Sequence, residues 1–166
     1  MYPNERLPRY ITWFNNLTRP AIWAVRFYRI SHKCYLAGVP MLPDVIDCFS
    51  RILTGVEIHC QADIGVGFKI DHGVGTVVGR GVVIGDYCHL WQGVTIGTHD
   101  PRLVTKEPQH PVIGNGVHIF AGAKVLGTIR IGDGATIGAN AVVLYDMPPG
   151  ATAVSPPATI KPPRNK

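Results

Sequence analysis

Acidic residues and histidines that could transfer protons are concentrated in two parts of this chain. A carboxylate beside a histidine fixes the tautomer and orientation of the imidazole, which can then act as a general base. Glu57 and His72 are 15 positions apart, close to one turn of the repeat described below, so they could stack on neighbouring turns. Such a base would take the proton from a hydroxyl group whose oxygen attacks an activated acyl group. The polar residues of this group are Glu57, His59, Asp71, His72, His99, Asp100 and His110.

The glycine-rich turn that holds His72 interrupts a regular pattern. A lone histidine in such a turn is usually structural. Here, however, the pattern slips by two residues at positions 71–75 (DHGVG), so regularity is lost where the acid and the histidine lie. This coincidence favours a functional interpretation, with His72 as the candidate base.

An aliphatic side chain returns at every sixth position over most of the chain. A short fixed period is typical of a solenoid, and a period of six predicts a hexapeptide β-helix. A short strand cannot bury its apolar side alone, so successive coils must stack into one core. We therefore expect a mainly β domain over residues 55–147, with roughly five coils of about 18 residues each. The repeating positions are Ile58, Ile64, Ile70, Val78, Ile84, Leu90, Ile96, Ile113, Ile119, Val125, Ile131, Ile137 and Val143.

Two segments do not follow the repeat. Residues 98–112 (THDPRLVTKEPQHPV) contain two acids, several basic groups and three prolines, so they cannot continue a coil. We expect this segment to leave the solenoid as a loop, and long loops on a rigid scaffold often carry function. The proline-rich tail, residues 148–166, is expected to wrap outside the coils.

Residues 1–54 are expected to form a helical cap. Residues 1–19 are polar and mixed, whereas Pro20 can occupy the first turn of a helix over residues 21–36. A second helix is expected over residues 43–53. We interpret the pair as a cap that covers the open end of the solenoid.

The composition restricts the partners and the compartment. The net charge is +5, but no Lys/Arg-rich run is interleaved with aromatic residues, which argues against nucleic-acid binding. Four cysteines without CxxC spacing indicate reduced thiols and a cytoplasmic protein. The sequence has no signal-peptide pattern and no apolar run of about 20 residues that could span a bilayer. Weak contact of the N-terminal helix with a membrane surface is an alternative that Trp13, Trp23 and Arg26 would suit.

Several motifs resemble those of the serine acetyltransferases, a family of hexapeptide acyltransferases. The resemblance runs from residues 28–32 (YRISH) to the end of the repeats, and its most specific parts are the aspartate–histidine turn and the histidine–proline loop. It implies a left-handed parallel β-helix, a homotrimer with active sites between subunits, and acetyl-CoA as the acyl donor. The other motifs are 56–59 (VEIH), 70–75 (IDHGVG), 77–79 (VVG), 92–97 (QGVTIG), 110–111 (HP), 121–127 (AGAKVLG) and 137–139 (IGA).

The resemblance also implies roles for individual polar residues. His72 would be the general base, and Glu57 stands where the family usually has an aspartate that orients this base. Asp71 and His110 would face the acceptor. The full set of acceptor-binding candidates is Asp71, His110, Gln109 and His59.

A second set of residues would bind the acyl donor. By resemblance, the backbone around Gly97, Ala121 and Ala139 would line a groove for the pantetheine arm of acetyl-CoA, since small side chains permit close approach. Lys124 and the basic tail could meet the phosphates of CoA. No metal is expected.

Two departures from the family concern the acceptor. Gln109 replaces an arginine that helps to hold the carboxylate of serine, and Arg102 or Lys106 could supply the missing cation. The family's long N-terminal helical domain, which carries an acid that helps to bind serine, has only a short counterpart. The resemblance implies L-serine as the acceptor, as in cysteine biosynthesis. The two departures leave a sugar hydroxyl, as in capsule or exopolysaccharide assembly, as the alternative.

Two other classes of β-helix protein fit less well. A metal-dependent hydratase resembling the gamma-type carbonic anhydrases needs three histidines that converge on one zinc ion, whereas His72, His89 and His110 are scattered. A purely structural β-helix would not require a histidine beside an acid together with a long polar loop.

Overall fold

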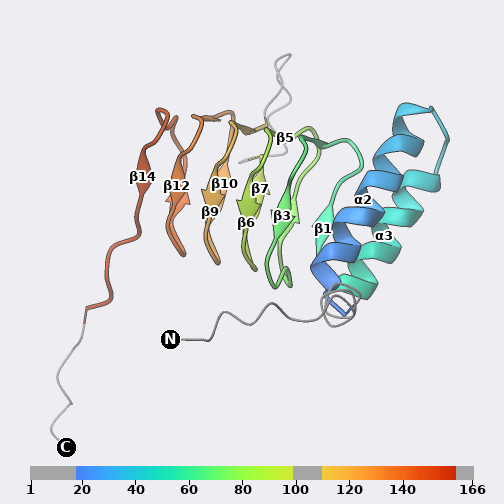
Figure 1. The fold of residues 1–166 in the computed structure, drawn as a ribbon, viewed down its shortest axis with the longest axis horizontal. Coiled ribbons are helices and arrows are strands. Elements are labelled where there is room, and N and C mark those ends of the chain that lie inside the picture. Colours follow the sequence, from blue (N-terminus) through green and yellow to red (C-terminus); the bar gives the residue numbers. More distant parts are fainter. Residues whose placement is uncertain (1–17, 99–109, 160–166) are drawn as a thin grey trace, which may run out of the picture.

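The computed structural model describes residues 18–98 and 110–159, and Figure 1 shows their arrangement. Two helices are followed by short parallel strands that wind into a left-handed β-helix, the fold that the hexapeptide period and the family resemblance predict. The helices are α2 (Pro20–Leu36) and α3 (Leu42–Thr54), close to the expected ranges. The strands are β1 (Glu57–Ile58), β2 (Asp63–Ile64), β3 (Lys69–Ile70), β4 (Val77–Val78), β5 (Val83–Ile84), β6 (His89–Leu90), β7 (Thr95–Gly97), β8 (Val112–Ile113), β9 (His118–Ile119), β10 (Lys124–Leu126), β11 (Arg130–Ile131), β12 (Thr136–Ile137), β13 (Val142–Val143) and β14 (Thr152–Ala153).

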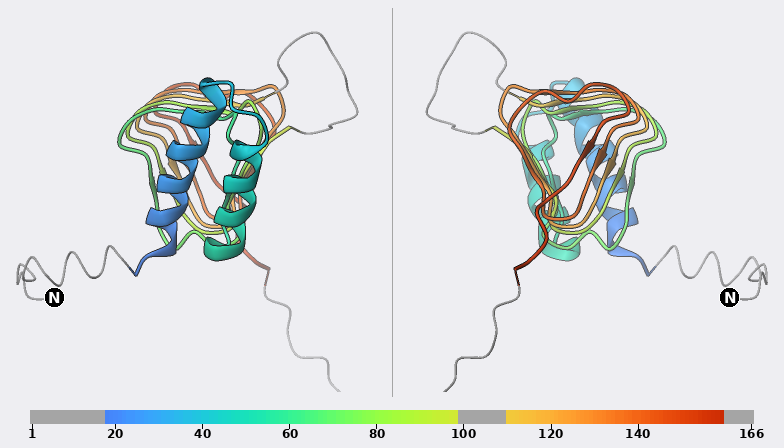
Figure 2. Two further views of the ribbon diagram at one scale, coloured as in Figure 1. Left: turned by 90° about the vertical axis from the view of Figure 1, so that its right-hand side faces the viewer. Right: turned by 90° about the vertical axis from the view of Figure 1, so that its left-hand side faces the viewer.

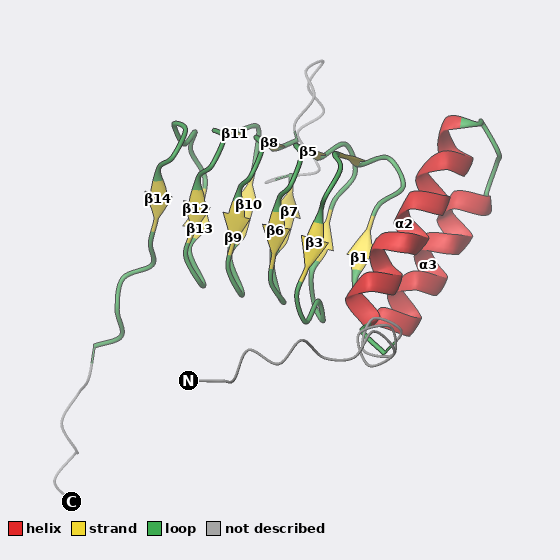
Figure 3. Cartoon of the chain, in the orientation of Figure 1, coloured by secondary structure: helices red, strands yellow, loops and turns green. Residues whose placement is uncertain are grey.

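Three parallel sheets form the sides of the coils (Figure 3). The first sheet is β1-β4-β7-β10-β13, the second is β2-β5-β8-β11, and the third is β3-β6-β9-β12-β14. Each coil contributes one strand to each sheet in turn, so the described strands make five coils, as the repeat predicts. Only closely stacked coils can satisfy the backbone groups of such short strands, because each strand pairs with strands of the adjacent coils.

The pairing register records where the repeat is interrupted. Val77 pairs with Thr95, 18 positions later, which is the regular length of a coil. Glu57 pairs with Val77, 20 positions later, because the turn at residues 71–75 adds two residues. Thr95 pairs with Lys124, 29 positions later, because residues 98–112 leave the repeat between β7 and β8. Residues 99–109 of the expected loop lie outside the described residues.

The aliphatic residues of the repeat point into the solenoid and form its core. Ile84, Leu90, Ile96, Ile113, Ile119 and Ile137 are among the fully buried side chains. Burying each one contributes about 1.5–3 kcal/mol relative to leaving it exposed. Glycine follows many of these residues because consecutive coils are in close contact at the corners. At Gly85, for example, a Cβ atom would lie 2.8 Å from the carbonyl carbon of Gly114.

The two helices lie side by side across the first coil, as Figure 2 shows from the end of the solenoid. The hydroxyl group of Tyr28 donates a 2.8 Å hydrogen bond to the carbonyl oxygen of Ala62. The guanidinium group of Arg29 donates to the carbonyl oxygens of Ile64 and Gly65. The YRISH motif thus attaches α2 to the first coil, and both helices contact that coil at the end of the solenoid.

The surroundings of Trp23 bear on the expected membrane contact. Trp23 packs against Phe27 with ring centroids 6.2 Å apart, and the guanidinium of Arg26 lies over the Trp23 ring. Trp13 lies outside the described residues. None of the helices that the structure describes has the length and apolar character needed to cross a membrane. Contact with a membrane surface stays a prediction.

The C-terminal tail differs from its expected position outside the coils. Met147 bridges to Ile131, and β14 pairs with β12, so residues 148–153 continue the last coil and the expected boundary at residue 147 falls inside it. Pro148 and Pro149 fit at this corner because the coil below presents Gly132, where a Cβ would lie 2.7 Å from the Cα of Pro149.

Candidate active site

The turn at residues 71–75 adds two residues to the first coil. His72 has a φ of 63°, in the left-handed region that few non-glycine residues occupy. Its exposed side chain therefore projects from a strained backbone position, which is common at functional sites. The N–H of Gly73 donates to the carbonyl oxygen of Asp71, and the N–H of Thr76 donates to that of Gly73. These hydrogen bonds fix the backbone of the turn, and with it the position from which the His72 side chain projects.

Close packing also fixes this turn from behind. A Cβ atom on Gly73 would lie 3.0 Å from both Ala21 of α2 and Val56 of the first coil. The N–H of Gly75 donates a 2.8 Å hydrogen bond to the carbonyl oxygen of Gly55. The cap and the first coil together therefore position His72.

Asp71 and His72 line a cleft beside the start of α2. The cleft has a volume of about 440 Å³ and is lined by Thr18, Arg19, Pro20, Ala21, Ile70, Asp71 and His72. A second hollow of about 470 Å³ adjoins it and shares Arg19 and Asp71. The two hollows together can hold a small polar molecule. The Asp71 carboxylate could bind a cationic group of that molecule, and the Arg19 guanidinium could bind an anionic group.

The carboxylate of Asp71 is held by a residue of the next coil. The Nε2 atom of His89 lies 2.9 Å from Oδ2 of Asp71. The His89 ring stacks on Trp91 at 4.0 Å, and Trp91 stacks on Phe120 at 4.4 Å. A hydrogen-bonded carboxylate backed by stacked rings has little freedom to rotate.

Glu57 is not stacked on His72 within this chain. Its carboxylate forms an ion pair with Arg51, with Nη1 and Oε2 3.3 Å apart. Among the described residues, no hydrogen bond or ion pair joins Glu57 to His72. The expected stacking assumed a regular coil, but the first coil is enlarged and pairs Glu57 with Val77. The role of Glu57 in orienting the base stays a prediction.

His59 lines a different cleft from that of His72. Asp44, Asp47, Cys48, Arg51, Glu57, Ile58 and His59 surround this cleft, between α3 and β1. The Nδ1 atom of His59 accepts a 3.1 Å hydrogen bond from the N–H of Gln61. The structure therefore brings His59 together with Glu57 and not with Asp71, and its acceptor-binding role stays a prediction.

His110 lies at another corner of the coil. It precedes β8, and its ring packs over Gly81 in the turn between β4 and β5. The Nδ1 atom is buried and has no hydrogen-bond partner among the described residues. Because His72 lies between the third and first sheets, and His110 between the first and second, one chain does not place both in one cleft. Gln109, Arg102 and Lys106 lie outside the described residues.

Two of the residues predicted to bind the acyl donor, Ala121 and Ala139, lie at the same corner of the coils as His72. The N–H of Asn140 donates to the carbonyl oxygen of Ala121, which stacks the turn that contains Ala139 on the turn that contains Ala121. Gly97 ends β7 at the other edge of the first sheet, on the side that leads to the second sheet. The Nζ atom of Lys124 donates to the carbonyl oxygen of Gly93 at 2.6 Å and to Thr95. Lys124 is thus tied to the previous coil, and its contact with CoA stays a prediction.

Comparisons with known proteins identify the family. A family model described as bacterial transferase hexapeptide (six repeats) matches residues 110–144. A serine acetyltransferase of Helicobacter pylori is 44% identical over 142 residues, which cover 86% of this chain and 81% of the relative. The chain belongs to the serine acetyltransferase family.

Other members are longer than this chain. A serine acetyltransferase of Synechococcus elongatus is 42% identical over 144 residues, which cover 87% of this chain and 58% of the relative. A solved structure of a serine acetyltransferase in complex with CoA superposes with a TM-score of 0.75 at 39% identity, covering 86% of this chain and 57% of that one. This chain thus spans less than two thirds of the length of several relatives that it matches.

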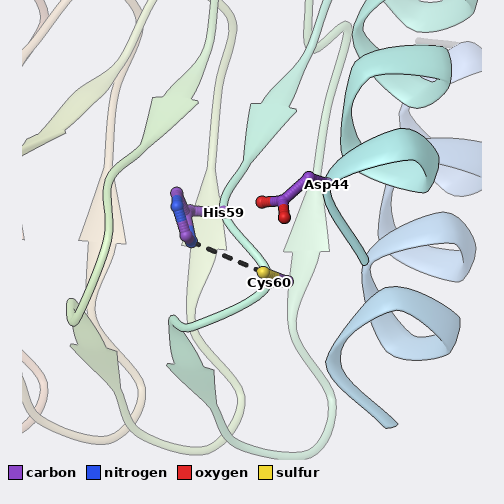
Figure 4. Close-up of side chains that lie close together, drawn as sticks. All are labelled: Asp44, His59 and Cys60. Atoms are coloured by element: carbon purple, nitrogen blue, oxygen red, sulfur yellow. Dashed lines mark hydrogen bonds between the residues drawn. The ribbon is translucent and has the colours of Figure 1, made fainter. Parts of the chain in front are cut away.

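A mixed group of side chains lies near the cleft of His59, and Figure 4 shows its members. Donor atoms of Asp44, His59 and Cys60 lie within 4.8 Å of one another, a spacing that could hold a metal ion. However, Nδ1 of His59 already accepts from Gln61, and burial and the carboxylate of Asp47 raise the pKa of the Cys60 thiol to about 11. The Sγ atom of Cys60 also lies 3.7 Å from Nδ1 of His59, so this nitrogen is already in contact with both Gln61 and Cys60.

Sequence reasoning missed two residues of the cleft beside α2. Arg19 precedes the expected helix and had no motif to mark it, yet it lines the cleft of His72. His89 was considered only as a scattered zinc ligand, although it lies 20 positions after Lys69, in the register that the enlarged first coil sets. If the two extra residues of the first coil are counted, the sequence pairs His89 with Lys69, two positions before Asp71.

Proposed function

We propose that this chain is an acetyl-CoA-dependent serine O-acetyltransferase. The single observation that carries the proposal is His72, which projects from a strained and tightly packed turn beside Asp71 into a cleft that suits a small acceptor. The family, and the relative that was solved in complex with CoA, support serine and acetyl-CoA as the substrates.

The reaction is a direct transfer within a complex of both substrates. The His72 imidazole takes the proton of the serine hydroxyl while that oxygen attacks the thioester carbonyl carbon. The C–S bond then breaks, and the proton passes to the sulfur of CoA as the acetyl ester is released. Backbone N–H groups near the carbonyl must stabilise the oxyanion, because negative charge develops there in the transition state.

Two charged residues fit the ends of the serine molecule. The carboxylate of Asp71 would bind its ammonium group, and the guanidinium of Arg19 would bind its carboxylate. Arg19 thereby replaces the family arginine whose position is occupied by Gln109. Charge-assisted hydrogen bonds of this kind are stronger than those between neutral groups.

The active unit is a trimer with active sites between subunits. The different corners occupied by His72 and His110 support this arrangement, because a neighbouring chain could bring its own His110 to the cleft of His72. The acyl donor would then lie along the corner that contains Ala121 and Ala139. Four free cysteines support a cytoplasmic location, where thiols stay reduced.

The test is release of free thiol from acetyl-CoA by the purified chain, measured with L-serine and, separately, with a panel of sugars and nucleotide sugars. Saturable release with L-serine supports the proposal. Turnover with a sugar and none with L-serine would overturn the assignment of the acceptor. No release with any hydroxyl compound would overturn the enzymatic assignment.

A further inference from the structure

Asp71, a candidate acceptor-binding residue, is held by His89, which belongs to none of the family motifs in the sequence. Asp71 directly follows β3, and His89 lies on β6 of the next coil. Their side chains meet at 2.9 Å, with His89 the more buried of the two: 22% of its side chain is exposed, against 46% for Asp71. Asp71 remains accessible to a ligand, while the residue that holds it is mostly covered.

The ring of His89 cannot easily turn away from this contact. It stacks on Trp91 with an interplanar angle of 22°, and Trp91 stacks on Phe120 with an angle of 15°. Phe120 belongs to the coil after that of Trp91, so three successive coils, counting that of Asp71, contribute to one connected group. Stacked aromatic rings attract one another beyond the burial of their area, which favours a single ring orientation.

The hydrogen bond leaves the carboxylate able to bind a cation. His89 meets only the Oδ2 atom of Asp71. A carboxylate has two oxygens and can accept several hydrogen bonds, so Oδ1 and the remaining lone pair of Oδ2 stay available. Asp71 borders both hollows beside α2, whereas His89 borders only the one that His72 does not line.

We propose that His89 is a positioning residue for the acceptor, one that holds the carboxylate of Asp71 in the orientation that binds the ammonium group of serine. This inference rests on the proposed function. His89 acts through Asp71 and takes no part in proton transfer, so its loss weakens acceptor binding and leaves the chemical step intact.

His118 provides a matched control from the same surface. It is the residue that pairs with His89 on the next strand of the third sheet, and its ring lies 5.9 Å from that of His89 in a tilted arrangement. It is more exposed than His89 and, among the described residues, it has no hydrogen bond to a carboxylate. His118→Ala therefore removes an imidazole from the same aromatic group without removing the support of Asp71.

The experiment is steady-state thiol release by the wild-type chain and by the variants His89→Ala, His89→Gln, His118→Ala, Asp71→Asn and the double variant Asp71→Asn/His89→Ala. We expect His89→Ala to raise KM for L-serine about tenfold, with kcat and KM for acetyl-CoA changed less than about twofold. His89→Gln should recover part of the loss, because its amide N–H can reach the carboxylate. His118→Ala should behave as the wild type.

The double variant separates positioning from packing. If His89 acts through Asp71, its removal has no further effect once Asp71 is Asn, so the double variant matches Asp71→Asn. Additive losses, or a His89→Ala variant that behaves like His118→Ala, would overturn the inference while the proposed function stands. A wild-type chain that does not turn over L-serine would instead overturn the proposed function and this inference with it.

Discussion

The ring of His110 occupies the space that a side chain at position 81 would need. A Cβ atom on Gly81 would lie 2.6 Å from Nε2 of His110. Gly81 also has a φ of 70°, which disfavours any other residue. The fit between a glycine and a histidine 29 positions later explains how a loop histidine acquires a defined place on the coils.

Replacing Gly81 by alanine should therefore displace His110. The left-handed backbone alone should lower the free energy of unfolding by about 1–2 kcal/mol. Displacement of the His110 ring should in addition lower kcat/KM for L-serine. Gly134→Ala is the control, because Gly134 has a φ of 65° but a Cβ added there would meet no described atom within 4 Å. Urea denaturation and thiol release should show similar destabilisation in both variants and loss of activity only in Gly81→Ala. Equal activities would contradict a role for His110 in the site.

Arg19 should determine affinity for the acceptor. Removing a charged hydrogen-bond partner of a carboxylate costs about 1.5–3 kcal/mol, so Arg19→Ala should raise KM for L-serine by about tenfold or more, with KM for acetyl-CoA unchanged. Arg130→Ala removes an exposed cation of the second sheet and serves as the control. If KM for L-serine is the same in both variants, another cation binds the carboxylate.

Glu57 has two possible partners, Arg51 and His72. In this chain its carboxylate faces Arg51, yet the family resemblance assigns it to His72. If that assignment holds, Glu57→Gln should lower kcat about tenfold to a hundredfold through the lost orientation of the base. Arg51→Ala should leave kcat near the wild-type value. Wild-type kcat in Glu57→Gln would restrict Glu57 to its pairing with Arg51.

Stability should fall at alkaline pH for a reason that can be traced to Cys60. Burial raises the pKa of its thiol from 9.0 to about 11, so between these values the unfolded chain ionises at this position while the folded chain does not. Loss of protons by the unfolded state favours unfolding, and the free energy of unfolding should decrease from pH 9 towards 11.

Chemical denaturation at pH 8 and pH 10 measures this decrease directly. Tyr28, whose pKa burial raises to about 12, contributes mainly above pH 10, its ordinary value. The variant Cys60→Ala should therefore lose less stability than the wild type between pH 8 and pH 10. An identical decrease in both proteins would assign the effect to other groups.

The sequence period predicted the solenoid and its five coils, because stacked coils of short strands require an aliphatic residue at every sixth position. It did not predict which face of α2 would be buried. The larger residues of that helix include Ile30, which is 53% exposed, whereas Ala21, Ala24 and Tyr28 face the coils. Small residues are required there because the helix lies close against the end of the solenoid. The spacing of apolar residues along a helix does not show how closely the helix packs against its neighbour.

Candidate site residues can be recognised in the sequence where the repeat is interrupted, but not where the stacking of coils brings side chains together. His72 and Asp71 are visible because they interrupt the repeat. The Asp71–His89 pair and the Arg19 cleft depend on the extra two residues of the first coil and on the position of the cap. The expected stacking of Glu57 on His72 failed in this chain for the same reason, since it assumed an uninterrupted coil.

The most direct test of the account is the effect of His72→Ala on acetyl transfer to L-serine. The side chain is exposed, so circular dichroism and thermal unfolding should show that the variant folds. A general base contributes about a hundredfold to ten-thousandfold to the rate, and we predict that kcat falls by this factor while KM for acetyl-CoA is retained. A folded His72→Ala variant that transfers acetyl to L-serine at the wild-type rate would contradict the assignment of His72 as the base.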